Sequence, residues 1–227
     1  MFCGNRQGDI ALNLTAVDLL AVIAALAAVL MAGSTHLRRN IQLYSLQTFV
    51  LASTTALLAN WRAEPQLYIV AFTIALVKAA AIPYFLQWIM RRISAMQDPC
   101  ITLAPPVAMH LSVLFMGLSY FLTQGLPVGL IIGQTWVTAT SSLSLLLTGL
   151  VLMLTRRIAL SQIIGFLVIE NGIYLFAQTQ TIGMPLVVEM GVLLDVLVAV
   201  MIAGLVVFRI QRSFEHVDVA QLSELKD

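Results

Sequence analysis

Charged residues are scarce in this sequence, and their scarcity excludes several classes of protein. Of the 227 residues, 10% are charged and 60% are hydrophobic, against roughly 25% and 45–50% in an ordinary soluble domain. No stretch between the hydrophobic runs is long enough to fold as a soluble domain. A soluble enzyme, a secreted domain and a disordered scaffold are therefore excluded, and the composition predicts a membrane protein.

The same scarcity limits which ligands the chain can hold. The 12 basic residues form no cluster of the kind that binds nucleic acid. Cys3 and Cys100 are the only cysteines, and the sequence has neither a Cys-x-x-Cys motif nor a Cys/His cluster. Iron–sulfur, haem c and structural zinc sites therefore lack support in the sequence. We expect neither a cofactor in this chain nor a nucleic-acid partner.

Long hydrophobic runs recur from end to end. Each is long enough, at about 1.5 Å per residue, to cross a hydrocarbon core of about 30 Å as a helix. Their continuous Leu, Ala, Val and Ile content is not the alternating pattern of a transmembrane strand. The sequence predicts an all-α, polytopic membrane protein with seven spans, at residues 14–33, 41–60, 66–90, 105–124, 128–154, 158–178 and 185–208.

The basic residues predict the orientation of these spans, because short loops rich in Lys and Arg stay in the cytoplasm. Pairs of arginines follow spans one, three, five and seven, whereas the opposite ends hold only Arg6 and Arg62. This alternation places the N-terminus outside and the C-terminus in the cytoplasm. A cleaved signal peptide over residues 10–33 is an alternative, although this run is longer than a signal core and is interrupted by Asp18.

Ionisable side chains lie at membrane depth, where each costs roughly 2.5–3.5 kcal/mol and needs a reason to be kept. Lys78, Glu170 and Asp195 fall near the middle of spans three, six and seven, so they share a depth and indicate a protein-lined or hydrated interior. A buried carboxyl beside an ammonium can change its protonation, which makes proton handling the candidate chemistry. The full set within the spans is Asp18, Lys78, His110, Glu170, Glu189 and Asp195.

Each of these residues also has a structural interpretation. Asp18 and Glu189 lie close enough to a span end to reach interfacial water, and His110 can be a hydrogen-bonded packing residue rather than a proton relay. Lys78 can be a counter-ion that locks two helices together. Two mid-membrane carboxyls on consecutive spans, Glu170 and Asp195, are the hardest to explain by packing.

Uncharged polar residues are candidates for the lining of a proton path. Some are serines and threonines, which also bond within their own helix and are weak evidence individually. Span five has many small residues, including Gly129-x-x-x-Gly133 and residues 138–144, which close helix packing explains. The candidate lining residues are Gln47 and Asn171, with Gln42, Thr48, Ser53 and Thr54 beside them.

Residues 156–175, RRIALSQIIGFLVIENGIYL, form the most specific motif in the chain. They resemble the HyfE family, the component E membrane subunit of group 4 nickel–iron hydrogenases. Shorter matches span most of the chain in the family's order: YSLQxxVLA from Tyr44, AFTIALVK ending at Lys78 with Pro83 downstream, VExGxxxD from Val188 to Asp195, and Asp218-Val-x-x-Leu222.

This resemblance implies a subunit of a multisubunit redox complex related to respiratory complex I. Spans five to seven look like an enlarged counterpart of the three-helix K subunit of complex I, which also resembles the MrpC component of Mrp-type sodium/proton antiporters. The intramembrane glutamates of the K subunit would then correspond to Glu170 and Asp195, with Asp replacing Glu on span seven. The implied proton path comprises Glu170, Asp195, Lys78, His110 and Glu189.

The resemblance also implies partners and location. Iron–sulfur clusters, and with them a nickel–iron site, are expected on partner subunits, since this chain has no catalytic centre of its own. The expected partners are antiporter-like subunits, a complex I-like membrane anchor subunit, cytoplasmic hydrogenase-like subunits and the lipid bilayer. The location is the cytoplasmic membrane of a bacterium or archaeon.

Three functions remain open from the sequence. The favoured one is a non-catalytic membrane subunit that contributes to proton or sodium translocation coupled to electron transfer. The chain can instead be a scaffold of the membrane arm, or a subunit of an Mrp-type antiporter. A free-standing rhodopsin-like pump is disfavoured because span seven has no lysine for a retinal Schiff base.

The chain divides into three parts on this interpretation. Residues 1–154 hold spans one to five, and residues 155–208 hold spans six and seven. Spans six and seven resemble the K subunit, and span five is expected to belong to the same unit. Residues 209–227 form a cytoplasmic tail with eight ionisable residues, counting His216. Such a tail is poorly ordered alone, so we expect it to dock on partner subunits.

Overall fold

The structure is a computed structural model that describes residues 4–93, 103–126 and 135–180, with the isolated positions 191 and 204. Every regular element in these ranges is a helix. The helices are α1 (Gly4–Ala32), α2 (Leu37–Arg62), α3 (Gln66–Thr73), the π-helix η1 (Ile74–Ala81), α4 (Ile82–Ile93), α5 (Pro105–Thr123), α6 (Trp136–Thr155) and α7 (Ala159–Gln180).

Six spans of the described residues are long and apolar enough to cross a membrane, and α3, η1 and α4 together form one of them. These six correspond to the predicted runs one to six, and all of their ends except the start of the fifth agree within four residues. The seventh predicted span, residues 185–208, lies outside the described residues except for positions 191 and 204. The predicted orientation of the termini stays a prediction.

Two predicted boundaries were wrong. Helix α2 begins at Leu37 rather than residue 41, so Arg38 and Arg39 lie in its first turn and not in a loop. Helix α6 begins at Trp136 rather than residue 128, because Thr135 caps it. The Thr135 hydroxyl accepts from the backbone N–H of Thr138, and the Thr138 hydroxyl accepts from the backbone N–H of Thr135.

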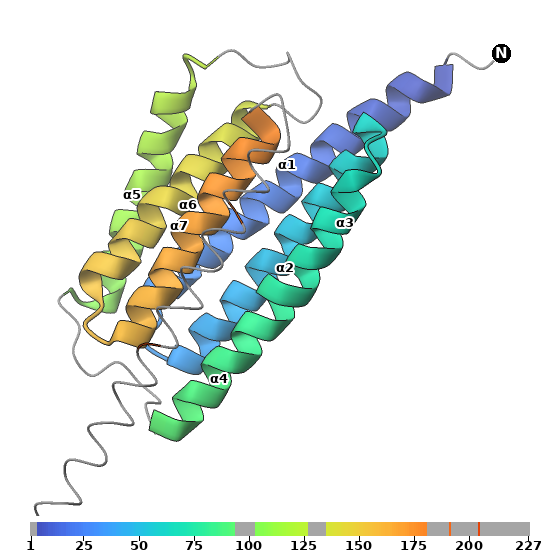
Figure 1. Ribbon diagram of the computed structural model, residues 1–227. Coiled ribbons are helices and arrows are strands. Elements are labelled where there is room, and N and C mark those ends of the chain that lie inside the picture. The colour runs from blue at the N-terminus through green and yellow to red at the C-terminus, as the bar shows by residue number, and fades with distance from the viewer. Residues whose placement is uncertain (1–3, 94–102, 127–134, 181–190, 192–203, 205–227) are drawn as a thin grey trace, which may run out of the picture.

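The spans form a bundle in which α1, α2, α6 and α7 lie at the centre (Figure 1). The α3–η1–α4 span packs mainly on α2, and α5 packs on α6 and α1, at the opposite side. These two outer spans are the least buried of the six, and α7 is the most buried. Buried apolar residues of α1, α2, α4, α6 and α7 share one core.

Glycines allow α6 and α7 to approach closely. A Cβ atom on Gly149 would lie 2.8 Å from the carbonyl oxygen of Gly165, and one on Gly172 would lie 2.9 Å from the carbonyl oxygen of Ser142. Small residues commonly mediate such helix contacts in membranes, where lipid is as apolar as the core. The prediction that span five packs through small residues is confirmed for residues 138–144, while Gly129 and Gly133 lie outside the described residues.

Candidate functional site

A buried ion pair joins the third and sixth spans. The Nζ atom of Lys78, on η1, lies 2.6 Å from Oε1 of Glu170, on α7. The exposed fraction is 5% for Lys78 and 2% for Glu170. Both residues lie near the middle of their spans, so the structure brings together two of the charged residues that the sequence placed at one depth.

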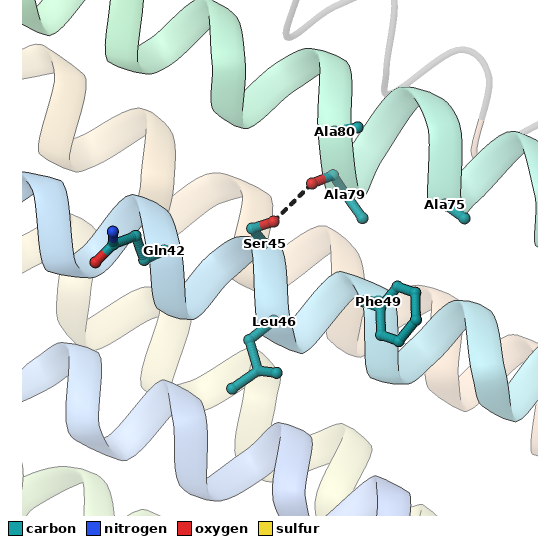
Figure 2. A pocket seen from close by; sticks show the side chains of 7 residues that line it. All are labelled: Gln42, Ser45, Leu46, Phe49, Ala75, Ala79 and Ala80. Carbon is teal, nitrogen blue, oxygen red and sulfur yellow. Dashed lines mark hydrogen bonds between the residues drawn. The ribbon is translucent and has the colours of Figure 1, made fainter.

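The π-helix η1 ends two residues before Pro83. Pro83 has no backbone N–H and cannot make the α-helical hydrogen bond to the carbonyl of Ala79. The Ala79 carbonyl accepts instead from the Ser45 hydroxyl of α2, at 2.6 Å (Figure 2). π-Helical turns are rare and are often found at functional sites. This π-helical segment carries Lys78, and the next residue, Ala79, is bonded to α2 through Ser45.

A pocket of about 530 Å³ lies between α2 and η1 beside this bond (Figure 2). Alanines of η1 form one wall, and larger side chains of α2 form the other. Gln42, a candidate lining residue, lies here rather than at the ion pair. The lining residues are Gln42, Ser45, Leu46, Phe49, Ala75, Ala79 and Ala80.

A layer of hydrogen bonds crosses the core beside the ion pair. The side-chain amide of Asn171 donates to Oε1 of Gln47 at 3.0 Å and to the Thr48 hydroxyl at 3.1 Å. Gln47 in turn donates to the backbone carbonyl of Ala24 at 3.0 Å. Buried polar groups must be paired in this way to offset their desolvation. The layer therefore joins α1, α2 and α7 at the depth of Glu170.

A second polar cluster lies nearer the ends of α2 and α7. The hydroxyl oxygens of Thr55 and Tyr174 are 3.0 Å apart, and the Thr55 hydroxyl lies 2.8 Å from Oε1 of Gln178, to which it can donate. The Arg62 guanidinium donates to the backbone carbonyl of Gln178 at 2.9 Å. The sequence interpretation missed this cluster, because an aromatic residue and a threonine in a span are usually packing residues.

The other predicted residues are not at the ion pair. His110, on α5, is exposed, and its Nδ1 lies 2.6 Å from the carbonyl oxygen of Pro106 one turn earlier. The hydroxyls of Ser53 and Thr54 donate to carbonyls of their own helix. Glu189 and Asp195 lie outside the described residues.

Two charged groups near the span ends have structural contacts. Asp18 accepts a short hydrogen bond from Thr135, the residue that caps α6, and the positive end of the helix dipole favours a carboxylate there. Arg156, counted in the sequence as a loop residue, is 2% exposed and donates to the carbonyls of Ala32 and Ser34. Arg156, which follows the last residue of α6, therefore holds that end of α6 beside the end of α1.

The ion pair is the chemically distinctive feature of the described residues. No group of three or more His, Cys, Asp or Glu side chains in those residues could hold a metal ion. A proton transferred from Nζ of Lys78 to Oε1 of Glu170 would convert two opposite charges into a neutral amine and a neutral acid. A nearby change of charge can shift this balance, since electrostatic interactions are strong where water is excluded.

The fold and the site define a class: an all-helical, multi-pass membrane protein with a buried Lys–Glu pair. The chain is 31% identical over 211 residues to the uncharacterised protein Rv0085 of Mycobacterium tuberculosis, an alignment that covers 93% of this chain and 96% of that protein. The chain belongs to the same family as this mycobacterial protein.

The chain is also similar to hydrogenase-4 component E. The proteins of that name from Escherichia coli K12 and Shigella flexneri are each 27% identical to it over 210 residues, covering 92% of this chain and 97% of theirs. No family model matches the sequence, and no solved structure matches it.

Proposed function

We propose that this chain is a non-catalytic membrane subunit of a hydrogenase-type redox complex, in which it contributes to proton or sodium translocation coupled to electron transfer. The observation that carries the proposal is the buried Lys78–Glu170 pair at mid-span. The similarity to hydrogenase-4 component E along 92% of the chain supports the hydrogenase context.

The pair can hold its one shared proton on either side chain without exposing a net charge to lipid. In its ionised form the two charges compensate each other, and in its neutral form each group avoids the cost of an unpaired buried charge. A redox-driven movement of charge in a partner subunit would favour one form over the other. The side chains of Gln47 and Asn171 stabilise the surrounding layer through their mutual hydrogen bond.

Asp195 and Glu189 extend the proposed route beyond the described residues. Asp195 lies in the predicted seventh span at a depth similar to that of Glu170, and spans joined by a short loop are usually neighbours. Proton exchange between these two carboxyls, directly or through water, is part of the proposal. His110 is not part of the route through the ion pair, because α5 packs on α6 and α1 rather than on η1.

Partner subunits supply the chemistry that this chain lacks. In the proposed complex they hold the iron–sulfur clusters and the nickel–iron site, and they include antiporter-like, complex I-like anchor and cytoplasmic hydrogenase-like subunits. Exposed apolar side chains on α5 and on the α3–η1–α4 span would contact these membrane partners or lipid. The proposed location is a bacterial or archaeal cytoplasmic membrane.

Purification of the tagged full-length chain in a mild detergent tests the assembly. Companions identified by mass spectrometry should include hydrogenase-like and antiporter-like subunits. Recovery with antiporter subunits alone would favour an Mrp-type antiporter, and recovery as a lone monomer would contradict the proposal. An assembled complex that pumps normally with Glu170→Gln would favour a scaffold role.

A further inference from the structure

Three buried polar side chains follow one face of α7 from the ion pair toward one end of the bundle. Glu170, Tyr174 and Gln178 are spaced four residues apart, which places them on the same side of a helix. Their exposed fractions are 2%, 8% and 1%. Across from them α2 places Thr55, which lies within hydrogen-bonding distance of both Tyr174 and Gln178.

The hydrogen bonds of Thr55 set the direction in which a proton can move along this stripe of polar side chains. Its single hydroxyl proton has two acceptors within reach, Oε1 of Gln178 at 2.8 Å and the backbone carbonyl of Leu51 at 2.9 Å. When Thr55 donates to either, its oxygen accepts from the hydroxyl of Tyr174. A proton can therefore pass from the Tyr174 oxygen to the Thr55 oxygen while Thr55 gives its own proton to Oε1 of Gln178. The side-chain nitrogen of Gln178 then releases a proton, and the resulting imidic acid returns to the amide.

The stripe extends most of the way from Glu170 to the membrane surface. Eight residues of α7 separate Glu170 from Gln178, a rise of about 12 Å, against about 15 Å for half of the hydrocarbon core. Helix α2 ends at Arg62, which donates to the backbone carbonyl of Gln178. Gln178 therefore lies beside a cationic side chain at the end of its span.

The half of α7 before Glu170 offers no matching stripe. From Glu170 toward the start of α7 the buried side chains are largely apolar, and they join the main core with residues of α2 and α4. This apolar set includes Ile41, Leu86, Ile89, Ile163, Ile164 and Leu167. On α7 the polar side chains thus run from Glu170 toward one end only, whereas in the other half of the bundle buried polar side chains lie on α2, at Asn40, Tyr44 and Thr48.

We propose that Tyr174 and Thr55 relay protons between Glu170 and water at the Arg62 end of the bundle, with bound water between the Glu170 carboxyl and the Tyr174 hydroxyl. At Tyr174 and Thr55 the hydroxyl oxygen gains one proton as it loses another, and at Gln178 Oε1 gains a proton as the amide nitrogen loses one. The relay groups therefore stay neutral, and the charge moves with the proton between Glu170 and water. This inference rests on the proposed function and names the route by which the ion pair exchanges its proton.

The test uses the assembled complex in sealed vesicles and measures protons translocated per electron transferred. Tyr174→Phe keeps the buried ring and removes the hydroxyl, and Thr55→Val does the same for the threonine. Thr54→Val is the matched control, since Thr54 is equally buried and donates to the backbone carbonyl of Val50. Thr55→Ser restores the hydroxyl, and Glu170→Gln reports on the ion pair itself.

We expect Tyr174→Phe and Thr55→Val to lower the proton ratio severalfold, while Thr54→Val and Thr55→Ser stay near the unaltered complex. Normal ratios for both test variants, with a low ratio for Glu170→Gln, would overturn the relay and leave the proposed function standing. A normal ratio for Glu170→Gln would contradict the proposed function. An equal loss in Thr54→Val would also overturn the relay, because it would assign the effect to packing.

Discussion

Lys78 lies in a π-helix that ends at Ala81, and Pro83 is the second residue of the α-helix that follows. The backbone N–H that Pro83 lacks would have bonded to the carbonyl of Ala79 in a continuous α-helix, and Ser45 takes its place. One proline thus lies at the end of the π-helical segment around a buried lysine, beside a carbonyl that bonds to another helix.

Pro83→Ala should therefore favour a regular α-helix through this span. The restored N–H would compete with Ser45 for the Ala79 carbonyl, and the change of helical form would turn Lys78 relative to Glu170. We expect the detergent-solubilised chain to be at least as stable to heat, because proline in a helix interior costs about 3 kcal/mol, while proton pumping falls. Pro65→Ala is the control, since Pro65 precedes α3; equal pumping losses in both would refute this account of Pro83.

Lys78→Met should lower turnover more than abundance. The carboxyl of Glu170 that remains can take up a proton and become neutral, which avoids most of the cost of an unpaired buried charge. Immunoblots of membranes measure abundance, and the redox activity per assembled complex measures turnover. Collapsed abundance with normal specific activity would identify Lys78 as a structural counter-ion.

Asn171→Leu should destabilise the isolated chain by about 1–2 kcal/mol. The change removes the donor to Gln47 and Thr48, and interhelical hydrogen bonds in membrane proteins are each worth about 0.6–1.7 kcal/mol. Unfolding in detergent, followed by circular dichroism, gives the difference. Asn60→Leu, at an exposed position near the end of α2, should have little effect, and equal losses at the two sites would contradict the prediction.

Gly172→Ala should weaken the contact between α6 and α7. The added Cβ would lie 2.9 Å from backbone atoms of Ser142 and Leu146, and overpacking of this kind costs roughly 1–3 kcal/mol. Gly117→Ala on α5 is a matched control, because no atom outside its own helix backbone and chain neighbours lies within 4 Å of a Cβ there. The melting temperature should fall for the first variant and hold or rise for the second.

Ala63→Gly should stabilise the chain by about 1 kcal/mol. Ala63 ends α2 in the left-handed region, with φ of 53°, where a residue with a Cβ atom pays roughly 1–2 kcal/mol. Glycine avoids this penalty. A lower melting temperature for Ala63→Gly would show that the left-handed conformation carries no such cost here.

The sequence predicted the six described spans because hydropathy reports directly on what a bilayer requires. It also placed Lys78 and Glu170 at one depth. Their pairing could not be predicted, because depth does not say which spans are neighbours or how each helix is rotated. The proline near Lys78 is visible in the sequence, but its effect depends on Ser45 of another helix.

Residues with ordinary side chains were the hardest to predict. Tyr174 and Thr55 belong to types that are common in membrane helices, and only their contact across α2 and α7 distinguishes them. Arg156 was counted for its charge as a loop residue, yet its guanidinium is buried against the carbonyls of Ala32 and Ser34. Periodicity and charge counting do not report such contacts between distant segments.

Proton pumping by the Glu170→Gln complex in sealed vesicles tests the central claim most directly. The variant keeps the size of the side chain and its capacity for hydrogen bonding while removing its titration. Glu64→Gln, at an exposed carboxyl between α2 and α3, serves as the control, and the rates are normalised to assembled complex. The account predicts an assembled, redox-active complex that builds a much smaller proton gradient; full pumping by Glu170→Gln would contradict it.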